Sequence, residues 1–325
     1  MRKGLISILI GAALSLSAPA MAEKQSFDSY VEGLKKESVE RGYDSTLIEQ
    51  AFSNLNYRER AVKADRNQPE KRLTLDEYIP RAVPDWKVAQ ARDLYNKHYD
   101  DLKRIGEIYG VQPRFLVALW GVESNFGKFT GNFNVIEALS TMAYDGRREA
   151  FFRNEVFEAL SILQQGHIGI DEFKGSWAGA MGQCQFMPSS FNAFAADGNN
   201  DGKKDIWNSK PDVFASSANY LKNAGWNDEY TWGRQVIIPK NLDNDLSGLS
   251  QDKAKTLAEW QALGVRRMNN ASLPNVDIKA WLIQPDDEYG RSYLVYGNYQ
   301  SLMKWNRSHY FALAVSHLAD RIKFG

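Results

Sequence analysis

Residues 116–127 read LVALWGVESNFG and predict a helix with an acidic residue near its end. Pro113 fits the first turn of this helix, and Gly127 fits the left-handed position just after it. Glu123 follows Leu119 by four residues, so it lies on the apolar face. A carboxyl group on that face is either paired or desolvated, and desolvation raises its pKa. A general acid requires a raised pKa, which makes Glu123 the candidate acid.

The composition is that of an ordinary globular protein. The 325 residues are 43% hydrophobic and 25% charged. This length allows one large domain with lobes, or two domains. The 40 Lys and Arg residues balance the 40 Asp and Glu residues, so no overall field indicates nucleic acid as a partner. The 9 Trp and 15 Tyr residues fit either core packing or stacking against sugar rings along a cleft.

The N-terminus predicts export. Residues 1–3 include two basic side chains, residues 4–16 are mostly apolar, and Ala20 and Ala22 supply the small residues of a cleavage site. We therefore expect residues 1–22 to be a cleaved signal peptide; the alternative is an uncleaved membrane anchor. Cys184 is the single cysteine, so we expect neither an internal disulfide nor a lipid-accepting N-terminal cysteine. The expected mature protein is soluble rather than a lipoprotein, and it has no transmembrane segment.

Helical periodicity dominates the first two thirds of the chain, and strand patterns follow it. The predicted helices cover residues 27–55 with one turn inside, 86–109, 113–126, 136–142, 148–165, 216–225, 257–263 and 310–322. The predicted strands cover residues 235–239, 278–283 and 292–296. Residues 57–75 show weak periodicity and predict a traverse over the surface. The expected fold class is α+β, mainly α, with a small β-containing lobe.

Residues 174–190 form an uncharged, glycine-rich stretch. Three glycines between positions 175 and 182 allow the backbone to approach another group closely. Gln183, Gln185 and the two following serines offer hydrogen bonds that suit hydroxyl and acetamido groups. The P-loop pattern is absent, so nucleotide binding is not indicated. A tight structural turn is the alternative interpretation.

Residues 197–205 read DGNNDGKKD and match the first half of an EF-hand calcium loop. Oxygen-bearing side chains stand at loop positions one, three, five and nine, with glycine at position six. Asn208 occupies the twelfth position, where a bidentate glutamate belongs, and Asp212 is a nearby acid that could replace it. The alternative is a solvated loop of Asx turns. The predicted ligands are Asp197, Asn199, Asp201, the carbonyl group of Lys203, Asp205 and Asp212.

The sequence excludes several other enzyme classes. Gly-x-Ser-x-Gly is absent, and the four histidines form no recognisable constellation with a nucleophile or a metal. Cys184 lacks a Cys-His signature and is interpreted as a small buried thiol. Glu137, Asp145 and Glu149 are interpreted as solvated or capping residues. A single acid, Glu123, then remains beside aromatic and uncharged amide side chains. These residue types are typical of a glycosidase active site.

Three motifs resemble those of the B-type lytic murein transglycosylases. They read WGVESNFG at 120–127, GAMGQCQFMPS at 179–189 and WNRS at 305–308. Their order and spacing match that family, and the Asp-rich loop follows the second motif as it does there. The resemblance implies a lysozyme-like catalytic core, with a helical domain and a small β domain around a peptidoglycan-binding cleft.

The resemblance also implies a division of the chain. It places a helical region at 23–104 that packs with the C-terminal helix at 304–325, a catalytic core with the EF-hand-like loop at 105–230, and the β lobe at 231–303. The implied partners are peptidoglycan glycan strands in the periplasm and complexes of cell-wall enzymes. No cofactor is expected for catalysis, and calcium is expected in a structural role.

The resemblance assigns roles to individual residues. It makes Glu123 the catalytic acid and residues 197–205 the calcium loop, with Asp212 as the remote ligand. By themselves, two arginines at the start of a helix fit either a solvated pair or a pair that binds an acyl or carboxylate oxygen. The glycan contacts that the resemblance implies are Arg147, Arg148, Ser176, Gln185 and Asn306.

A single acid indicates substrate-assisted chemistry rather than a two-acid scheme. In this hypothesis Glu123 protonates the oxygen between N-acetylmuramic acid and N-acetylglucosamine, and the muramoyl 2-acetamido group shields the developing cation. Ionised Glu123 then accepts the proton of the 6-hydroxyl group, which closes on C1 to give a 1,6-anhydro end. Two alternatives remain: a lysozyme-type muramidase that admits water, and a non-catalytic wall-binding protein in which Glu123 is structural.

Overall fold

A computed structural model describes residues 25–66, 73–287 and 290–323. The predicted signal peptide, residues 1–22, lies outside the described residues. The described part is mostly helical with a small antiparallel sheet, which confirms the expected α+β, mainly α fold class. Within these ranges, no helix is both long enough and apolar enough to cross a membrane.

The elements follow one another in the chain as a long helical series and then a short β region. The α-helices are α1 (Phe27–Glu40), α2 (Ser45–Ala51), α3 (Glu59–Arg66), α4 (Leu75–Ala82), α5 (Asp85–Lys97), α6 (Tyr99–Tyr109), α7 (Pro113–Ser124), α8 (Val135–Asp145), α9 (Glu149–Gln164), α10 (Pro188–Phe194), α11 (Lys210–Asn223), α12 (Leu257–Ala262), α13 (Gly297–Trp305) and α14 (His309–Lys323). The strands are β1 (Phe133–Asn134), β2 (Lys174–Gly175), β3 (Gly233–Ile237), β4 (Lys255–Thr256), β5 (Arg266–Arg267), β6 (Lys279–Ile283) and β7 (Ser292–Val295).

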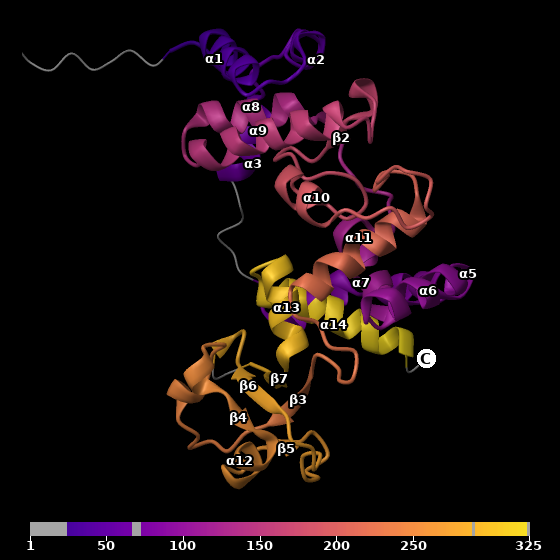
Figure 1. Cartoon of the computed structure of the whole chain (residues 1–325). Helices are drawn as coiled ribbons and strands as arrows, with labels where there is room; N and C mark the ends of the chain where they lie inside the picture. Colours follow the sequence, from indigo (N-terminus) through magenta and orange to yellow (C-terminus); the bar gives the residue numbers. More distant parts are fainter. Residues whose placement is uncertain (1–24, 67–72, 288–289, 324–325) are drawn as a thin grey trace, which may run out of the picture.

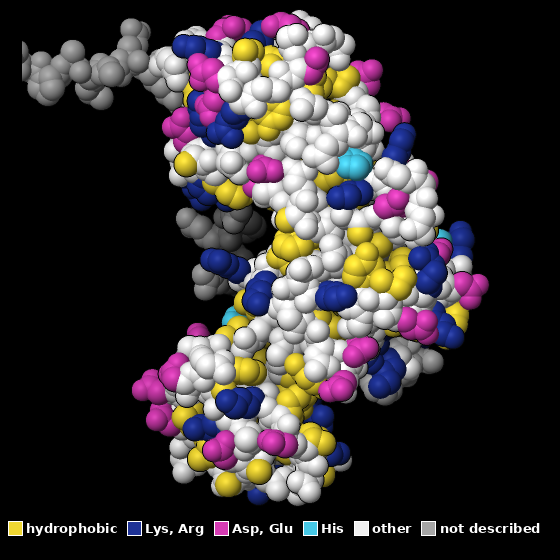
Figure 2. Space-filling model, in the orientation of Figure 1, with side chains coloured by type: hydrophobic (Ala, Val, Ile, Leu, Met, Phe, Trp, Pro, Cys, Tyr) yellow, Lys and Arg dark blue, Asp and Glu magenta, His cyan; other side chains and the backbone are white. Residues whose placement is uncertain are grey.

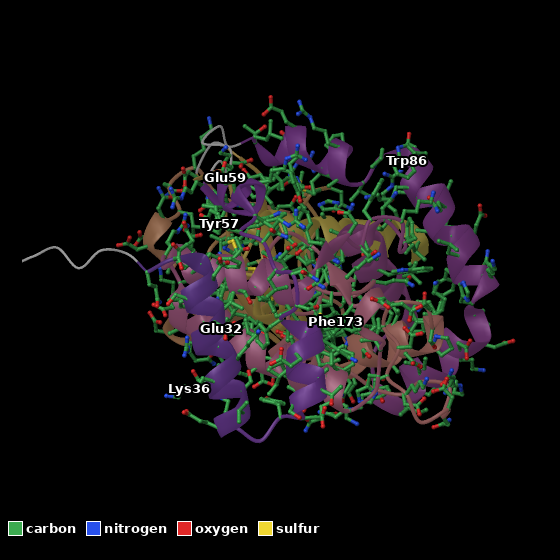
Figure 3. The ribbon with its side chains drawn as sticks, turned by 90° about the horizontal axis from the view of Figure 1, so that it is seen from above. Glu32, Lys36, Tyr57, Glu59, Trp86 and Phe173 are labelled. Atoms are coloured by element: carbon green, nitrogen blue, oxygen red, sulfur yellow. The ribbon has the colours of Figure 1, made fainter. Side chains whose placement is uncertain are left out.

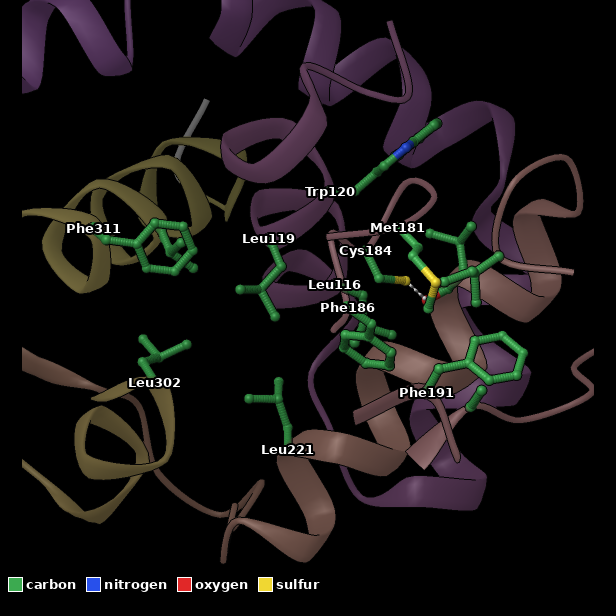
Figure 4. Close-up of a cluster of buried hydrophobic side chains, with 14 of the residues drawn as sticks. Leu116, Leu119, Trp120, Met181, Cys184, Phe186, Phe191, Leu221, Leu302 and Phe311 are labelled. Carbon is green, nitrogen blue, oxygen red and sulfur yellow. Dashed lines mark hydrogen bonds between the residues drawn. The ribbon is translucent and has the colours of Figure 1, made fainter. Parts of the chain in front are cut away.

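Helix α7 lies in the middle of the molecule, where α5, α6, α11 and α14 pack around it (Figure 1). Its residues 115–121 are all buried. Figure 4 shows Leu116 and Leu119 of α7 in this core together with side chains from other segments, among them Phe186, Leu221, Leu302 and Phe311. Burial by several helices explains the nearly unbroken apolar run of α7, because a helix covered on most sides needs few polar residues.

One end of the molecule consists of α8 and α9 with the first three helices (Figure 1). Helices α1 and α3 pack on α8, and α2 packs on α9. Figure 3 looks down on this end and shows Lys36 of α1 at the edge of the molecule. Helices α4 and α5 instead pack on α14. The proposed division of the chain, with residues 23–104 packing on the C-terminal helix, stays a prediction.

Several helices differ from their predicted bounds. The helix predicted over 86–109 breaks at His98, whose φ of −108° and ψ of 20° separate α5 from α6. The predicted surface traverse at 57–75 contains α3, and the helix predicted at 216–225 begins earlier, at Lys210. No helix was predicted at α13. Apolar periodicity continues across His98, so the break has no signal in the pattern.

The β lobe forms the opposite end of the molecule (Figure 1). Its five strands run in the order β4-β6-β7-β3-β5, and every pairing is antiparallel. Strands β3, β6 and β7 confirm the three predicted strands. A small separate core, which includes the fully buried Trp260, fills the lobe. Figure 2 shows the surface hollowed between this lobe and the α8–α9 end.

Candidate active site

Glu123 is the penultimate residue of α7, and the chain turns sharply after it. Pro113 begins the helix, and residues 125–127 all have left-handed φ values of 50°, 60° and 80°. A Cβ atom on Gly127 would lie only 2.3 Å from Oε1 of Gln183. The close contact therefore requires glycine at this position, and the positive φ favours it. The predicted helix end is confirmed.

The carboxyl group of Glu123 is partly buried and accepts one hydrogen bond. The indole Nε1–H group of Trp305 donates to Oε1 of Glu123 at 2.5 Å. Burial raises the pKa of Glu123 to about 7, and the hydrogen bond from Trp305 acts in the opposite direction. The raised pKa matches the prediction. Near neutral pH such a group can first donate a proton and then accept one.

The ring of Trp305 is held by two aromatic neighbours. Its centroid lies 4.8 Å from that of Tyr220 and 5.2 Å from that of Phe186. The Tyr220 hydroxyl group donates to the carbonyl oxygen of Lys304 at 2.7 Å, which connects α11 to the end of α13. This contact with the acid was not predicted from the sequence. Trp305 lies 182 residues from Glu123, and no local pattern pairs two positions so far apart.

The glycine-rich segment is fixed to the last turn of α7. Oε1 of Gln183 accepts a hydrogen bond from the Trp120 indole at 2.8 Å, and the Ser124 hydroxyl donates to the Gln183 carbonyl oxygen at 2.8 Å. Cys184 is buried beside this contact, and burial raises the pKa of its thiol to about 12. The interpretation of Cys184 as an unreactive buried thiol is confirmed.

The predicted glycan contacts lie on three segments. The Ser176 hydroxyl accepts hydrogen bonds from two backbone N–H groups of its own turn, at 3.3 and 3.0 Å. The Gln185 side chain donates to two backbone carbonyl groups, at 3.2 and 2.9 Å, and its backbone φ is 51°. Asn306 is exposed just after α13. Ser176 and Gln185 therefore stabilise local turns, and sugar binding by all three residues stays a prediction.

Arg147 and Arg148 both form ion pairs with Asp65, at 3.2 and 3.0 Å. Asp65 is buried and belongs to α3, a helix that was not predicted. The Arg148 guanidinium also lies 4.7 Å from the centroid of the Phe152 ring. Asp65 thus orients both arginines, and neither is simply solvated. Their contact with a glycan stays a prediction.

Two other carboxyl groups are buried rather than solvated. Glu137 is 5% exposed and accepts a hydrogen bond from Nε of Arg58. The Asp145 side chain is also 5% exposed and pairs with Arg66 at 2.5 Å. The interpretation of both as solvated or capping is wrong, because α3 and the residue before it bring these arginines onto α8. Glu149, the third carboxyl group of that interpretation, is exposed.

The Asp-rich loop is folded by its own side chains. The Asp197 carboxylate accepts hydrogen bonds from three backbone N–H groups of the loop, at 2.7 to 3.2 Å. The fully buried Asp212 accepts from the N–H groups of Gly198 at 2.8 Å and Asp205 at 2.7 Å. Burial raises the pKa of Asp212, and these two hydrogen bonds lower it. Asp212 therefore connects the two ends of the loop.

The donor set of this loop suits calcium, because its side chains and one carbonyl group supply hard oxygen ligands. Asp212 accepts one backbone N–H group on each oxygen, and Asp197 likewise accepts such groups on both of its oxygens, so these hydrogen bonds do not distinguish the two as ligands. Among the described residues, no three acidic, histidine or cysteine side chains converge as a metal cluster. The calcium assignment of Asp197, Asn199, Asp201, Lys203, Asp205 and Asp212 stays a prediction.

Comparisons with known proteins agree with this geometry. A family model described as "Transglycosylase SLT domain" matches residues 26–320. The membrane-bound lytic murein transglycosylase B of Escherichia coli (strain K12) is 32% identical over 240 residues, which are 70% of this chain. The match covers 62% of that protein, less than two thirds of its length.

Solved structures give the same result over nearly the whole chain. SltB3 from Pseudomonas aeruginosa, in complex with NAG-anhNAM-pentapeptide, matches with a TM-score of 0.89 and 39% identity and covers 93% of this chain and 80% of that one. The Escherichia coli lytic transglycosylase Slt35, in complex with calcium, matches with a TM-score of 0.78 and 25% identity, over 90% and 92% of the two chains.

Proposed function

Because this chain belongs to the B-type lytic transglycosylase family, we propose that it cleaves the glycan strands of peptidoglycan without water. The bond to be cleaved is the β-1,4 bond between N-acetylmuramic acid and N-acetylglucosamine, and the product carries a 1,6-anhydro end. The observation that carries this proposal is the Glu123 carboxyl group, whose pKa burial raises to about 7. The anhNAM ligand of SltB3 supports the same class of product.

In the first step Glu123 acts as an acid. Its proton passes to the glycosidic oxygen while the bond from that oxygen to muramoyl C1 breaks, and the electron pair stays on the leaving oxygen. The carbonyl oxygen of the muramoyl 2-acetamido group bonds to C1 and takes up the positive charge. This substrate group replaces the second carboxylate of an ordinary retaining glycosidase.

In the second step the same group acts as a base. The Glu123 carboxylate accepts the proton of the 6-hydroxyl group, O6 bonds to C1, and the bond from C1 to the acetamido oxygen breaks. The acetamide is restored and Glu123 is again protonated, so no water is consumed. One group can serve both steps because its pKa lies near the working pH.

Product analysis tests this function. The chain from residue 23 onward is incubated with purified peptidoglycan, and the soluble fragments are identified by mass spectrometry. Anhydro-muropeptides, lighter by one water than hydrolysed fragments, are expected. Reducing ends would instead show a muramidase with the same acid, and the absence of fragments would favour a wall-binding protein.

We propose that the loop at 197–205 holds a structural calcium ion. Its ligands would be the side chains of Asp197, Asn199, Asp201, Asp205 and Asp212 and the carbonyl group of Lys203. The calcium complex of Slt35 supports calcium as the ion. A site that binds only the folded chain raises its stability by about 2.7 kcal/mol at a calcium concentration one hundred times Kd. The melting temperature is therefore expected to be higher in calcium than in chelator. No difference, or the same difference in Asp201→Asn, would contradict the site.

We further propose that residues 1–22 direct export to the periplasm and are removed there. The basic, apolar and small-residue regions of this segment support the proposal. Periplasmic protein from bacteria that express the whole chain is expected to begin at Glu23 in N-terminal sequencing. A chain that retains Met1, or one found only in the cytoplasm, would contradict it.

A further inference from the structure

The hydrogen bond from Trp305 distinguishes the two oxygens of Glu123. An indole N–H group only donates, so Oε1 of Glu123 must accept this hydrogen bond whether the carboxyl group is neutral or ionised. In the neutral acid the proton then resides on Oε2. No described residue donates a hydrogen bond to Oε2, so this oxygen is available to a substrate.

We propose that Trp305 is a positioning residue for this acid: its indole N–H group fixes the transferable proton on Oε2 of Glu123 and stabilises the carboxylate left after transfer. The inference rests on the proposed function of Glu123. Trp305 itself transfers no proton. Oε2 gives its proton to the glycosidic oxygen in the first step and accepts the proton of O6 in the second, while the indole keeps its N–H group throughout.

The hydrogen bond from Trp305 becomes stronger when Glu123 loses its proton. A hydrogen bond to an ionised oxygen is roughly twice as strong as one to a neutral oxygen. Trp305 therefore stabilises the carboxylate that appears when the glycosidic oxygen is protonated. This effect opposes the effect of burial, which favours the neutral acid.

The surroundings of Trp305 make it suitable for positioning. Tyr220 and Phe186 pack against its ring, and the Tyr220 hydroxyl fixes the backbone of the preceding residue, Lys304. Trp305 ends α13, which follows β7 directly and packs on α11 and α14. Helix α13 thus connects Glu123 on α7 with strand β7 of the β lobe.

The titratable groups around α7 leave Glu123 to determine the pH dependence. Tyr78 of α4 and Cys184 interact with the charge of Glu123, and burial is the main cause that raises both their pKa values. Burial also raises the pKa of Tyr220 on α11 and lowers the pKa values of His98, between α5 and α6, and His309 on α14. These side chains are therefore neutral around pH 7.

The test removes the N–H group and keeps an aromatic ring. In Trp305→Phe the pKa of Glu123 is expected to rise, because a hydrogen bond that lowers it is lost. The alkaline limb of the kcat/KM profile, which reports the free enzyme, should move up by about one pH unit, and kcat should fall about tenfold. An unshifted limb would overturn the inference, since a merely structural tryptophan would lower activity without moving the profile.

A matched control is available in the same chain. The Trp232 indole donates to the Asp320 carboxylate at 2.9 Å, outside the candidate site. Trp232→Phe removes the same kind of hydrogen bond and should leave the pH profile of activity unchanged. A shift of equal size in this variant would also overturn the inference.

A second measurement does not depend on activity or on the fold of the phenylalanine variant. Replacing Trp305 by 3-benzothienylalanine exchanges only the N–H group for sulfur. Carbon-13 NMR titration, with Glu123→Gln to assign the signal, should then give a higher pKa for Glu123 than in the wild type. An unchanged pKa would contradict the role of Trp305, whereas the wrong product from the wild type would contradict only the proposed function.

Discussion

Helix α7 carries a partly buried glutamate and helix α9 a fully buried one, and the surroundings of the two carboxyl groups differ. On α9, Glu155 is 1% exposed, and its two oxygens accept hydrogen bonds from the N–H group of Ser189 at 2.9 Å and from its hydroxyl group at 2.6 Å. On α7, Glu123 accepts one hydrogen bond, at Oε1. Burial raises the pKa of both groups. The two glutamates differ because Oε2 of Glu123 has no hydrogen-bond donor among the described residues, whereas both oxygens of Glu155 have one.

This comparison separates a structural acid from a chemical one. The hydrogen bonds of Glu155 join α9 to the first turn of α10, so its carboxyl group is used entirely within the protein. Glu123 is fixed through one oxygen, and in the proposed mechanism the other oxygen serves the substrate. Burial and a raised pKa alone therefore do not identify the acid, because the number of donors around each oxygen is also needed.

The largest expected effect is on catalysis. Glu123→Gln keeps the size of the side chain and an oxygen that can accept from Trp305, but it removes the proton that is transferred. Turnover of peptidoglycan should fall at least about 1,000-fold, while the circular dichroism spectrum stays unchanged. A variant with a tenth of the wild-type rate would show that another group supplies the proton.

The second expected effect is on stability and its dependence on pH. The pKa of Glu123 is about 7 in the folded chain, whereas that of an unperturbed glutamate is 4.5, so between these values the folded chain holds a proton that the unfolded chain has lost. Its contribution to stability is thus present at low pH and is lost as the pH rises through 7. From pH 4 to 8 the free energy of unfolding should fall by up to about 3 kcal/mol more in the wild type than in Glu123→Gln. Parallel curves from urea titrations would contradict the raised pKa.

The third expected effect concerns Glu155, whose replacement should lower stability rather than activity. Glu155→Ala leaves the N–H and hydroxyl groups of Ser189 without their acceptor, which should cost roughly 2 kcal/mol of unfolding free energy. The rate per folded molecule should stay within about twofold, because Glu155 is used within the fold. Urea unfolding and a product assay on the same preparation check both statements. A large loss of rate without loss of stability would make Glu155 a functional acid.

The local sequence around α7 contained most of what could be predicted about the acid. Pro113 and Gly127 mark the ends of the helix, and the spacing from Leu119 puts Glu123 on the buried face, because both signals act within a few turns of helix. The raised pKa follows from that burial. The three central strands of the β lobe could be predicted for the same reason, since alternation and turn residues are local.

The rest depends on contacts between distant segments. Trp305 contacts Glu123 across 182 residues, and its motif gives no sign of which side chain it meets. Helix α3 has weak periodicity, yet it and the preceding residue bring Arg58, Asp65 and Arg66 to the α8–α9 end. Two acids that were expected to be solvated are thereby buried. A pattern shows that a face is buried but not which element covers it.

The smallest effect concerns Asp65, which tests whether an incompletely satisfied oxygen is enough to make an acid. Oδ2 of Asp65 is buried and makes no hydrogen bond, although Nη1 of Arg147 lies 3.2 Å away as an ion pair. Both Arg147 and Arg148 pair with this carboxyl group, so it is used within the fold. Asp65→Asn should therefore leave kcat unchanged and lower the free energy of unfolding by about 1 kcal/mol, because both arginines are largely exposed.

The same variant addresses the predicted glycan contact of the two arginines. Without Asp65 they lose their orientation, and KM for glycan strands should rise about twofold to threefold if they bind substrate. Asp101→Asn is the matched control, since it breaks an exposed pair with Arg104 on α6 and should change neither constant. A tenfold fall in kcat for Asp65→Asn would mean that a carboxyl group beside two cations also takes part in the chemistry. The distinction between Glu123 and the other buried acids would then need a criterion other than its one free oxygen.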